Sequence, residues 1–312
     1  MNIKTILLGT AAGLMSVSAA AAADLPGEPV PAAVDYVKVC DTFGKGFFYI
    51  PGTETCLDIS GRVRAKAEID FDDAVTFKAD GRVQFDARTA TEYDTLRSFL
   101  EIKTTNAAGF EVGKAFIQLS YFTIGFAADF MDGFGGVYGD TDRNNFGSTD
   151  LTAQVMVDDL GGGFYVGLAG IISDSGDKLV ASSDGDWEVQ GIVGISGQPW
   201  GSAAIAASYL DATESFLVKA GAEFTVTDEL SVAASAAYDD AKEETYLALG
   251  ASYTATSALT VYANVGYEVD AEEFGATVGA DYGIVSGLTL TTEVVYDETD
   301  EFTGLVMLSR TW

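Results

Sequence analysis

The side chains that could do chemistry in this 312-residue chain are carboxylates, arginines and lysines, because the chain contains no histidine. The absence of histidine excludes a Ser-His-Asp or Cys-His nucleophile and an imidazole-bound metal. The sequence therefore predicts no enzyme, no metal site and no cofactor. Charged residues can still set up an electric field, and their positions along the chain indicate where that field lies.

Positive charge gathers in one part of the chain. Nine of the 17 lysines and arginines lie between residues 62 and 114. The residues that we assign to a basic wall are Arg62, Arg64, Arg82, Arg88, Arg97 and Lys103. A glycine-rich acidic segment follows at residues 128–148, and its candidate residues are Asp129, Asp132, Asp140 and Asp142. If the two sets face each other across water, they form a constriction whose transverse field orients polar solutes. The alternative is that they are ordinary solvated charges.

The two cysteines, Cys40 and Cys56, lie close together in the sequence. In an exported chain such a pair is expected to be oxidised, and the alternative is two buried free thiols. A disulfide closing a loop of this length stabilises the folded state by about 3 kcal/mol on the chain-entropy model. We therefore predict a disulfide between Cys40 and Cys56.

The first residues have the features of a secretory leader. Lys4 precedes an apolar stretch at residues 6–17, and small residues follow up to Ala23. This order is typical of a cleaved signal peptide, which we expect to be residues 1–22. Removing Lys4 leaves 16 basic against 47 acidic residues, a formal charge of −31. Such acidity argues against nucleic acid as a partner.

The elements that must position the charged residues are β-strands. Apolar and polar residues alternate with a period of two between clusters of turn residues. The expected strands are residues 57–71, 81–89, 96–104, 112–120, 122–127, 149–157, 163–171, 187–196, 202–210, 214–226, 231–238, 244–254, 259–267, 273–283, 288–297 and 302–312. An even strand number is what a bacterial membrane barrel requires. The sequence thus predicts a barrel over residues 57–312, preceded by a periplasmic-side segment, residues 23–56, that carries the cysteine pair.

The alternation alone does not say which face meets water. In the first expected strand Arg62 and Arg64 share one face, and Val63 and Ala65 share the other. A soluble sheet puts its polar face in water, whereas a membrane barrel turns its apolar face to lipid and lines its interior with polar residues. The leader, the even strand count and the terminal aromatic Trp312, which we expect to be an assembly signal, favour the barrel. The expected fold is an all-β, 16-stranded antiparallel transmembrane β-barrel with an in-folded third outward loop.

The cysteine-bearing segment resembles the N-terminal signature of the general porins of alpha-proteobacteria. The similarity covers Tyr36–Asp41 and Gly46–Leu57, leads into Gly61–Arg64, and returns at Ala115–Leu119. The resemblance implies a homotrimer, passive diffusion and a third loop folded into the barrel. The chain departs from the family in ending on Trp312, where general porins usually have Phe, and in its short outward loops.

We therefore predict an outer-membrane porin with a water-filled channel for small hydrophilic solutes and ions. Its expected partners are outer-membrane lipid and lipopolysaccharide, together with further copies of the chain in a trimer. Small residues such as Ala204, Ala206 and Ala234 are expected on the lipid-facing wall. The alternatives are a solute-specific channel and a non-conducting structural or adhesin barrel. The candidate aromatic contacts of a solute-specific channel are Phe134, Tyr138 and Phe146.

Overall fold

A computed structural model describes residues 37–71, 74–105, 109–134, 138, 146–173, 186–297 and 301–312. The expected signal peptide, residues 1–22, lies outside this range, as do Asp140 and Asp142. No helix in these described ranges is long and apolar enough to cross a membrane.

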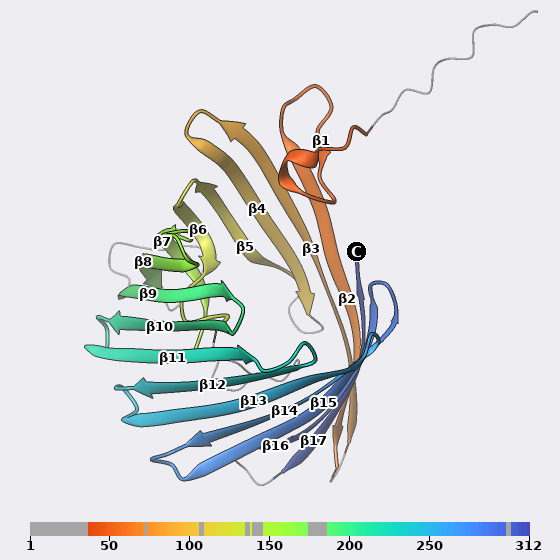
Figure 1. Cartoon of the computed structure of the whole chain (residues 1–312), viewed down its shortest axis with the longest axis vertical. Helices are drawn as coiled ribbons and strands as arrows, with labels where there is room; N and C mark the ends of the chain where they lie inside the picture. Colours follow the sequence, from red (N-terminus) through yellow and green to blue (C-terminus); the bar gives the residue numbers. More distant parts are fainter. Residues whose placement is uncertain are drawn as a thin grey trace, which may run out of the picture. The chain divides into compact units, whose positions relative to one another are not determined.

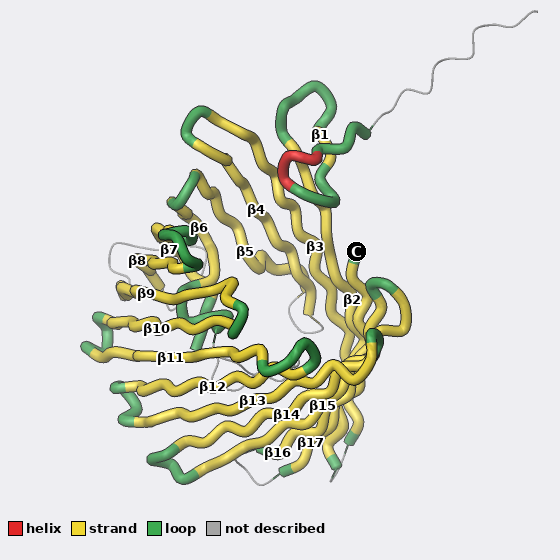
Figure 2. Tube along the Cα trace, in the orientation of Figure 1, coloured by secondary structure: helices red, strands yellow, loops and turns green. Residues whose placement is uncertain are grey.

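Strands make up most of the described chain (Figures 1 and 2). Sixteen of them form the barrel: β2 (Cys56–Asp70), β3 (Val75–Thr91), β4 (Asp94–Thr105), β5 (Gly109–Leu119), β6 (Phe122–Ala128), β7 (Thr149–Val157), β8 (Phe164–Ser173), β9 (Asp186–Gln198), β10 (Gly201–Leu210), β11 (Ser215–Thr225), β12 (Leu230–Asp239), β13 (Glu244–Thr256), β14 (Leu259–Glu268), β15 (Glu273–Val285), β16 (Leu288–Tyr296) and β17 (Phe302–Thr311). All sixteen predicted strands are confirmed, with ends that move by a few residues.

The barrel closes between its first and last strands. Each strand pairs antiparallel with its neighbours in the sequence, and β17 pairs with β2 from Thr303 opposite Asp70 to Thr311 opposite Arg62. Beyond that, Trp312 and Gly61 exchange two backbone N–H···O bonds of 3.2 Å. The sheet therefore has no open edge along β17. Closure pairs the backbone N–H and C=O groups that an edge strand would leave exposed.

The two faces of the sheet are reversed relative to a soluble protein. Asn264 and Thr277 are buried on the inner face, whereas Val265 and Val278, one residue further along, are 50% and 62% exposed on the outer face. Large apolar side chains thus cover the outside and polar ones line the inside, the arrangement of a barrel that faces lipid. The polar face of the sheet is therefore its inner face, which alternation alone did not establish.

Threonines fix two of the short turns that connect the strands. The Thr227 hydroxyl accepts the backbone N–H groups of Glu229 and Leu230, and Thr256 does the same for Ala258 and Leu259. A hydroxyl that accepts N–H groups two and three residues later stabilises a tight turn locally. The hydroxyl groups of these threonines therefore stabilise the two turns from within the turn sequence itself.

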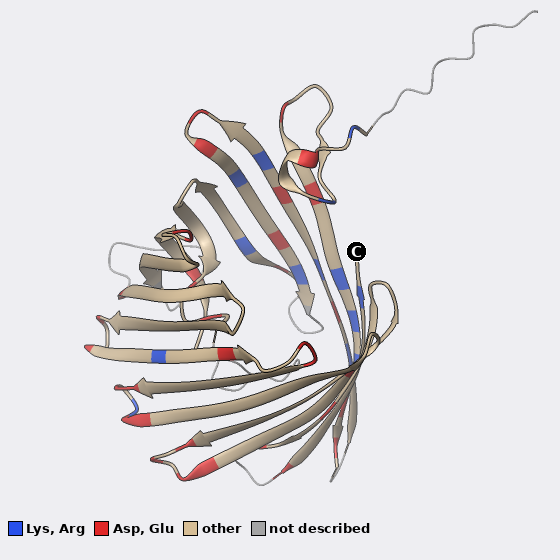
Figure 3. Ribbon diagram, in the orientation of Figure 1, with Lys and Arg blue, Asp and Glu red and all other residues tan. Residues whose placement is uncertain are grey.

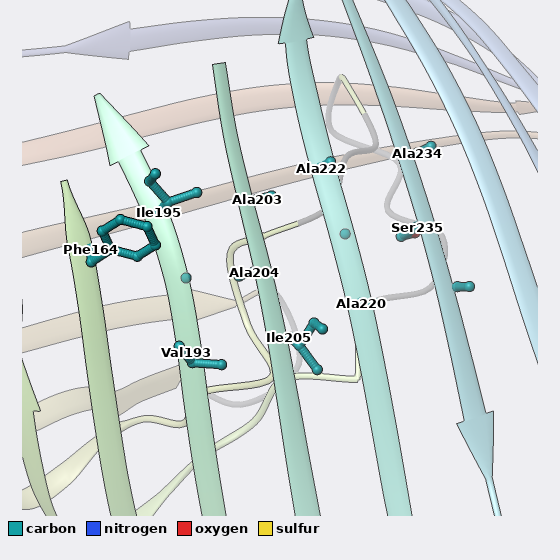
Figure 4. Close-up of a pocket in the computed structure, with 13 residues that line it drawn as sticks. Phe164, Val193, Ile195, Ala203, Ala204, Ile205, Ala220, Ala222, Ala234 and Ser235 are labelled. Carbon is teal, nitrogen blue, oxygen red and sulfur yellow. The ribbon is translucent and has the colours of Figure 1, made fainter. Parts of the chain in front are cut away.

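The small residues of β9–β12 divide between the two faces. An apolar hollow of about 550 Å³ on this wall is lined by outward-facing residues such as Val193, Ile205 and Ala234 (Figure 4). Ala204 and Ala206 were expected on the same outer face, but they are buried on the inner face, where they pack against Phe130 and Met131. That expectation was wrong for these two because the side-chain period of two puts them on the face opposite to Ile205.

A disulfide joins Cys40 to Cys56, with a Cα–Cα distance of 6.0 Å. The segment it closes contains a short helical turn, η1 (Asp41–Phe43), and the two-residue strand β1 (Phe48–Tyr49). Strand β1 pairs with Leu57 and Cys56 of β2, and both sulfur-bearing residues are buried beside Phe47. The disulfide predicted from the spacing is therefore present, and β2 begins at its second cysteine.

Candidate functional site

The predicted basic wall lies on the inner face of β2, β3 and β4. Antiparallel register places Arg62 opposite Arg82, and Arg88 opposite Arg97. Bands of positive charge therefore run side by side across β2–β5 (Figure 3). Like charges directly opposite each other destabilise a sheet, so the wall needs anionic partners.

Those partners are carboxylates of the same wall. Arg64 Nε lies 2.8 Å from Asp80 Oδ1, and Arg82 Nη1 lies 3.6 Å from Glu101 Oε2. Lys103 Nζ lies 3.3 Å from Glu111 Oε1. From the sequence we instead expected the counter-charge to come from the acidic segment at residues 128–148. The wall is therefore a ladder of alternating charge rather than a purely basic surface.

Asp86 is the most heavily used acid of this ladder. Arg88 donates from Nε and Nη2 to its two oxygens at 3.0 and 2.8 Å, and Arg97 donates from the same two atoms at 3.0 and 2.9 Å. Two bidentate guanidinium groups on one carboxylate fix both arginine planes. This cluster joins β3 to β4.

The segment after β6 begins at a buried carboxylate. Asp129 is 7% exposed, and its Oδ1 accepts the backbone N–H groups of Met131 and Asp132. Its Oδ2 accepts from Gln190 Nε2 and from the Ser148 hydroxyl, both at 3.2 Å. We expected Asp129 to be a water-facing charge, but its burial and four hydrogen bonds make it an anchor for both ends of the segment. Asp132, by contrast, is exposed.

Apolar contacts hold the next two residues against the inner wall. Phe130 and Met131 pack on Ala169, Ala204 and Ala206, and a Cβ atom added to Gly167 would lie 2.7 Å from the Phe130 ring. Small residues on β8 and β10 therefore make the room in which these two side chains sit. The Phe130 N–H donates to Gln190 Oε1 at 2.8 Å.

Lys219 of β11 is a basic residue that contacts the described part of this segment. It is 4% exposed, its Nζ donates to the Met131 carbonyl at 3.1 Å, and it lies 4.7 Å from the centre of the Phe134 ring. Buried cations are stable only when such contacts replace their hydration. Lys219 lies outside the predicted basic cluster. The one feature of the sequence that could have indicated its role is an isolated lysine beside small residues in a strand.

Further along, Tyr138 is bound by a strand on the other half of the barrel. Asn264 of β14 accepts the Tyr138 N–H at 3.0 Å and donates to the Tyr138 carbonyl at 2.8 Å. The Tyr138 hydroxyl donates to Glu223 of β11 at 3.2 Å. Burial, with a smaller contribution from Glu223, raises the pKa of Tyr138, so its hydroxyl stays protonated as a donor. The Phe146 ring meets Tyr246 of β13 edge to face at 4.9 Å.

The aromatic residues of the segment therefore pack against the wall. Phe134 lies under Lys219, Tyr138 is bound to Asn264 and Phe146 contacts Tyr246. These contacts favour a positional role for them over a row of solute contacts. Asp140 and Asp142 lie outside the described residues.

The Asp129 anchor leads to a pH-dependent expectation. Burial raises the pKa of the Asp129 carboxyl, so the folded anchor holds its proton more tightly than a free carboxyl, whose pKa is about 4. The anchor is then most stable below the pKa of a free carboxyl, and it loses stability as pH rises through the higher pKa of folded Asp129. Open-channel current noise in the wild type should rise as pH increases from the pKa of a free carboxyl through the pKa of folded Asp129.

The Asp129→Asn variant is the matched control, since an amide does not titrate. Asp150 and Glu188, which share Ser148 and Gln190 with Asp129, stay in place in this variant. Equal pH dependence in the variant and the wild type would assign the effect to those neighbours and contradict the expectation.

The chain is similar to known proteins over most of its length. A family model described as Porin subfamily matches residues 24–310. Porin Omp2b of Brucella suis is 33% identical over 273 residues, covering 74% of this chain and 72% of that protein. Porin Omp2a of Brucella ovis is 31% identical over 276 residues, covering 74% and 77%.

Solved structures share the fold. A mutant of Rh. blastica porin superposes with a TM-score of 0.64 at 16% identity, covering 82% of this chain and all of that chain. The outer membrane channel DcaP of Acinetobacter baumannii gives a TM-score of 0.65 at 15% identity, covering 85% and 99%. These likenesses support the barrel architecture independently of the sequence signature.

Proposed function

The chain belongs to the porin subfamily and is a channel protein of the bacterial outer membrane, and we propose that it is a passive, water-filled passage for small hydrophilic solutes and ions whose width is set by the segment after β6. A closed barrel of sixteen strands leaves an aqueous interior unless something fills it. The observation that carries the proposal is the position of Tyr138.

Tyr138 is ten residues beyond the end of β6, yet Asn264 on β14 binds its backbone. In a closed ring of sixteen strands, β14 is eight positions from β6 and therefore on the opposite side. The Asn264 side chain is 2% exposed on the inner face, so the contact supports a path through the interior. We propose that this segment is the third outward loop, that it folds into the barrel, and that it forms the constriction.

Membrane insertion is supported by aromatic residues at both rims of the outer face. Ring pairs at one rim are Trp187–Tyr209, Phe216–Tyr238 and Phe274–Tyr296, and the other rim has Trp200–Phe224. Trp200 and Tyr209 are nine residues apart, about 30 Å along a strand. At a tilt of about 40° this gives a band of about 23 Å, close to the apolar height of outer-membrane barrels. We propose that Trp312, whose ring covers Gly61, belongs to the Trp200 rim.

Ion selectivity should be weak and tilted toward cations. The wall arginines are largely balanced by Asp80, Asp86 and Glu101, so the remaining acidic residues decide the sign. Exposed charges in bulk water are screened within about 8 Å at physiological salt, which leaves those at the narrow section most effective.

Planar-bilayer recordings test this function. The wild-type channel should conduct KCl, and replacing Asp140 and Asp142 together by Asn should move the reversal potential under a salt gradient toward anions. A matched double change at Asp239, the last residue of β12, and Asp240, in the short connection that follows, should have a smaller effect. If the Asp140/Asp142 variant leaves both conductance and reversal potential unchanged, those acids do not face the constriction.

We also propose that the channel works as a homotrimer in contact with lipopolysaccharide, as its resemblance to general porins implies. Native mass spectrometry of the protein in mild detergent should give a mass three times that of the chain. A monomer under conditions where conductance is retained would contradict the trimer without touching the channel function.

A further inference from the structure

We propose that the lumen wall carries a subsite for small aromatic carboxylates, formed by Arg88, Arg97, Phe99 and Phe116. The subsite lies on the inner face of β3, β4 and β5, toward the end of the barrel where Cys56 and Trp312 lie. The inference rests on the water-filled lumen proposed above. It adds a ligand class that the third loop does not supply.

Register brings the four residues together. Arg88 lies opposite Arg97, and Asp86 lies opposite Phe99. Phe99 in turn lies opposite Phe116. These residues share the strand face that also carries Glu101, which is buried inside the barrel. The cluster therefore belongs to the lumen wall and to three adjacent strands, a rigid support for a site.

The Arg97 guanidinium is held flat with one face on aromatic carbon. Asp86 binds its Nε and Nη2, which sets the plane. The rings of Phe99 and Phe116 are stacked with centres 5.1 Å apart, and Arg97 Cζ lies 5.0 Å and 5.3 Å from those centres. The Arg97 side chain is 26% exposed, so its remaining surface is available to a solute. A planar ring stacks well on a guanidinium plane.

The cluster also favours a negative charge on the ligand. Asp86 serves both guanidinium groups, and Asp58, which lies opposite Asp86 and also interacts with Arg88, offsets the remaining positive charge. The attraction for a carboxylate therefore comes from the N–H donors that Asp86 leaves unused. A guanidinium has five N–H donors. The bonds to Asp86 use two of them on each arginine, and Arg97 Nη1 also donates to Gln118 Oε1 at 3.5 Å. Phe47 covers Arg88 at 4.9 Å, so Arg97 supplies the stacking face and Arg88 supplies further donors for the ligand carboxylate.

Neither group alone would define this ligand. Arginines without the phenylalanines would attract any small anion, and the phenylalanines without the arginines would attract any apolar ring. A solute must also leave a channel, so binding has to be weak. We expect a dissociation constant of about 1 mM or weaker.

The test uses the full mature protein in planar bilayers with three probes. Benzoate carries both a ring and a charge, cyclohexanecarboxylate carries the charge without a planar ring, and benzyl alcohol carries the ring without the charge. Benzoate should add saturable current fluctuations to the open channel. The other two probes should add far weaker ones at the same concentration.

Two variants locate the site. Arg97→Lys keeps the charge and loses the planar face, and the pair Phe99→Leu with Phe116→Leu keeps the bulk and loses the rings. Each should weaken benzoate binding about tenfold, the range expected for a partly desolvated cation–π contact. Lys78→Gln is the control, because it removes one positive charge from the same face of β3. The Lys78 side chain contacts Glu68 and not the cluster.

The outcomes separate this inference from the channel function. Saturation by benzoate that depends on Arg97 and on the two rings supports the subsite. Equal effects of benzoate and cyclohexanecarboxylate, or benzoate binding unchanged in both variants, would overturn it while KCl conductance remains. Should the double phenylalanine variant fail to fold, Arg97→Lys alone decides. A wild-type protein that does not conduct KCl would instead overturn the proposed channel function.

Discussion

Replacing Asn264 by Leu is expected to raise the single-channel conductance and to make the open channel noisy. Asn264 makes two hydrogen bonds to the backbone of Tyr138, and each contributes about 1 kcal/mol. Losing both should raise the population of the released segment about thirtyfold, since every 1.4 kcal/mol is a factor of ten. The released state should appear as steps to a larger current.

The control for this variant is Thr277→Val. Thr277 lies opposite Asn264 in the β14–β15 register and is equally buried, so the change removes a polar group from the same place on the wall without touching Tyr138. Thr277→Val should conduct like the wild type. Equal conductance in the Asn264→Leu and Thr277→Val channels would show that Tyr138 does not hold the constriction.

Removing the disulfide is expected to release the N-terminal segment and leave the barrel intact. Cys40 and Cys56 are 16 residues apart, and closing such a loop contributes about 3 kcal/mol on the chain-entropy model. Strand β1 has two residue pairs with β2, which is too little to hold the segment in place by itself. Protease should therefore cut between residues 40 and 56 in a variant with both cysteines changed to Ser.

The comparison needs a reduced wild-type sample. Dithiothreitol should make the wild-type segment as sensitive to protease as that of the double Ser variant, and it should have no effect on the variant. Barrel resistance to protease should not change in either sample, because the β17–β2 closure begins at Gly61, after the disulfide-bonded segment. A segment that stays protected after reduction would assign its stability to Phe47 and its contact with Arg88.

The strands were predictable because their signal is local. Alternation along a strand depends on the pleat, and the pleat is a property of each residue and its neighbours. The Cys40–Cys56 pair was equally accessible, since export and short spacing suffice to predict it. Charged residues on the inner face of β2 and β3 could be identified for the same reason, because Arg62, Arg64 and Arg82 follow the alternation.

Which side chains and backbone groups contact each other between strands and across the barrel was decided by tertiary structure alone. Asp86 is shared by Arg88 and Arg97 because of the register between β3 and β4, and register depends on how the strands slide when the ring closes. Tyr138 and Asn264 are 126 residues apart, and nothing local in either sequence indicates that they meet. Asp129 shows the same limit, because a carboxylate in a glycine-rich segment has the same sequence context whether it faces water or is buried against Gln190. The sequence by itself determined which faces carry charge, and the closure of the barrel determined which charges and backbone groups meet inside it.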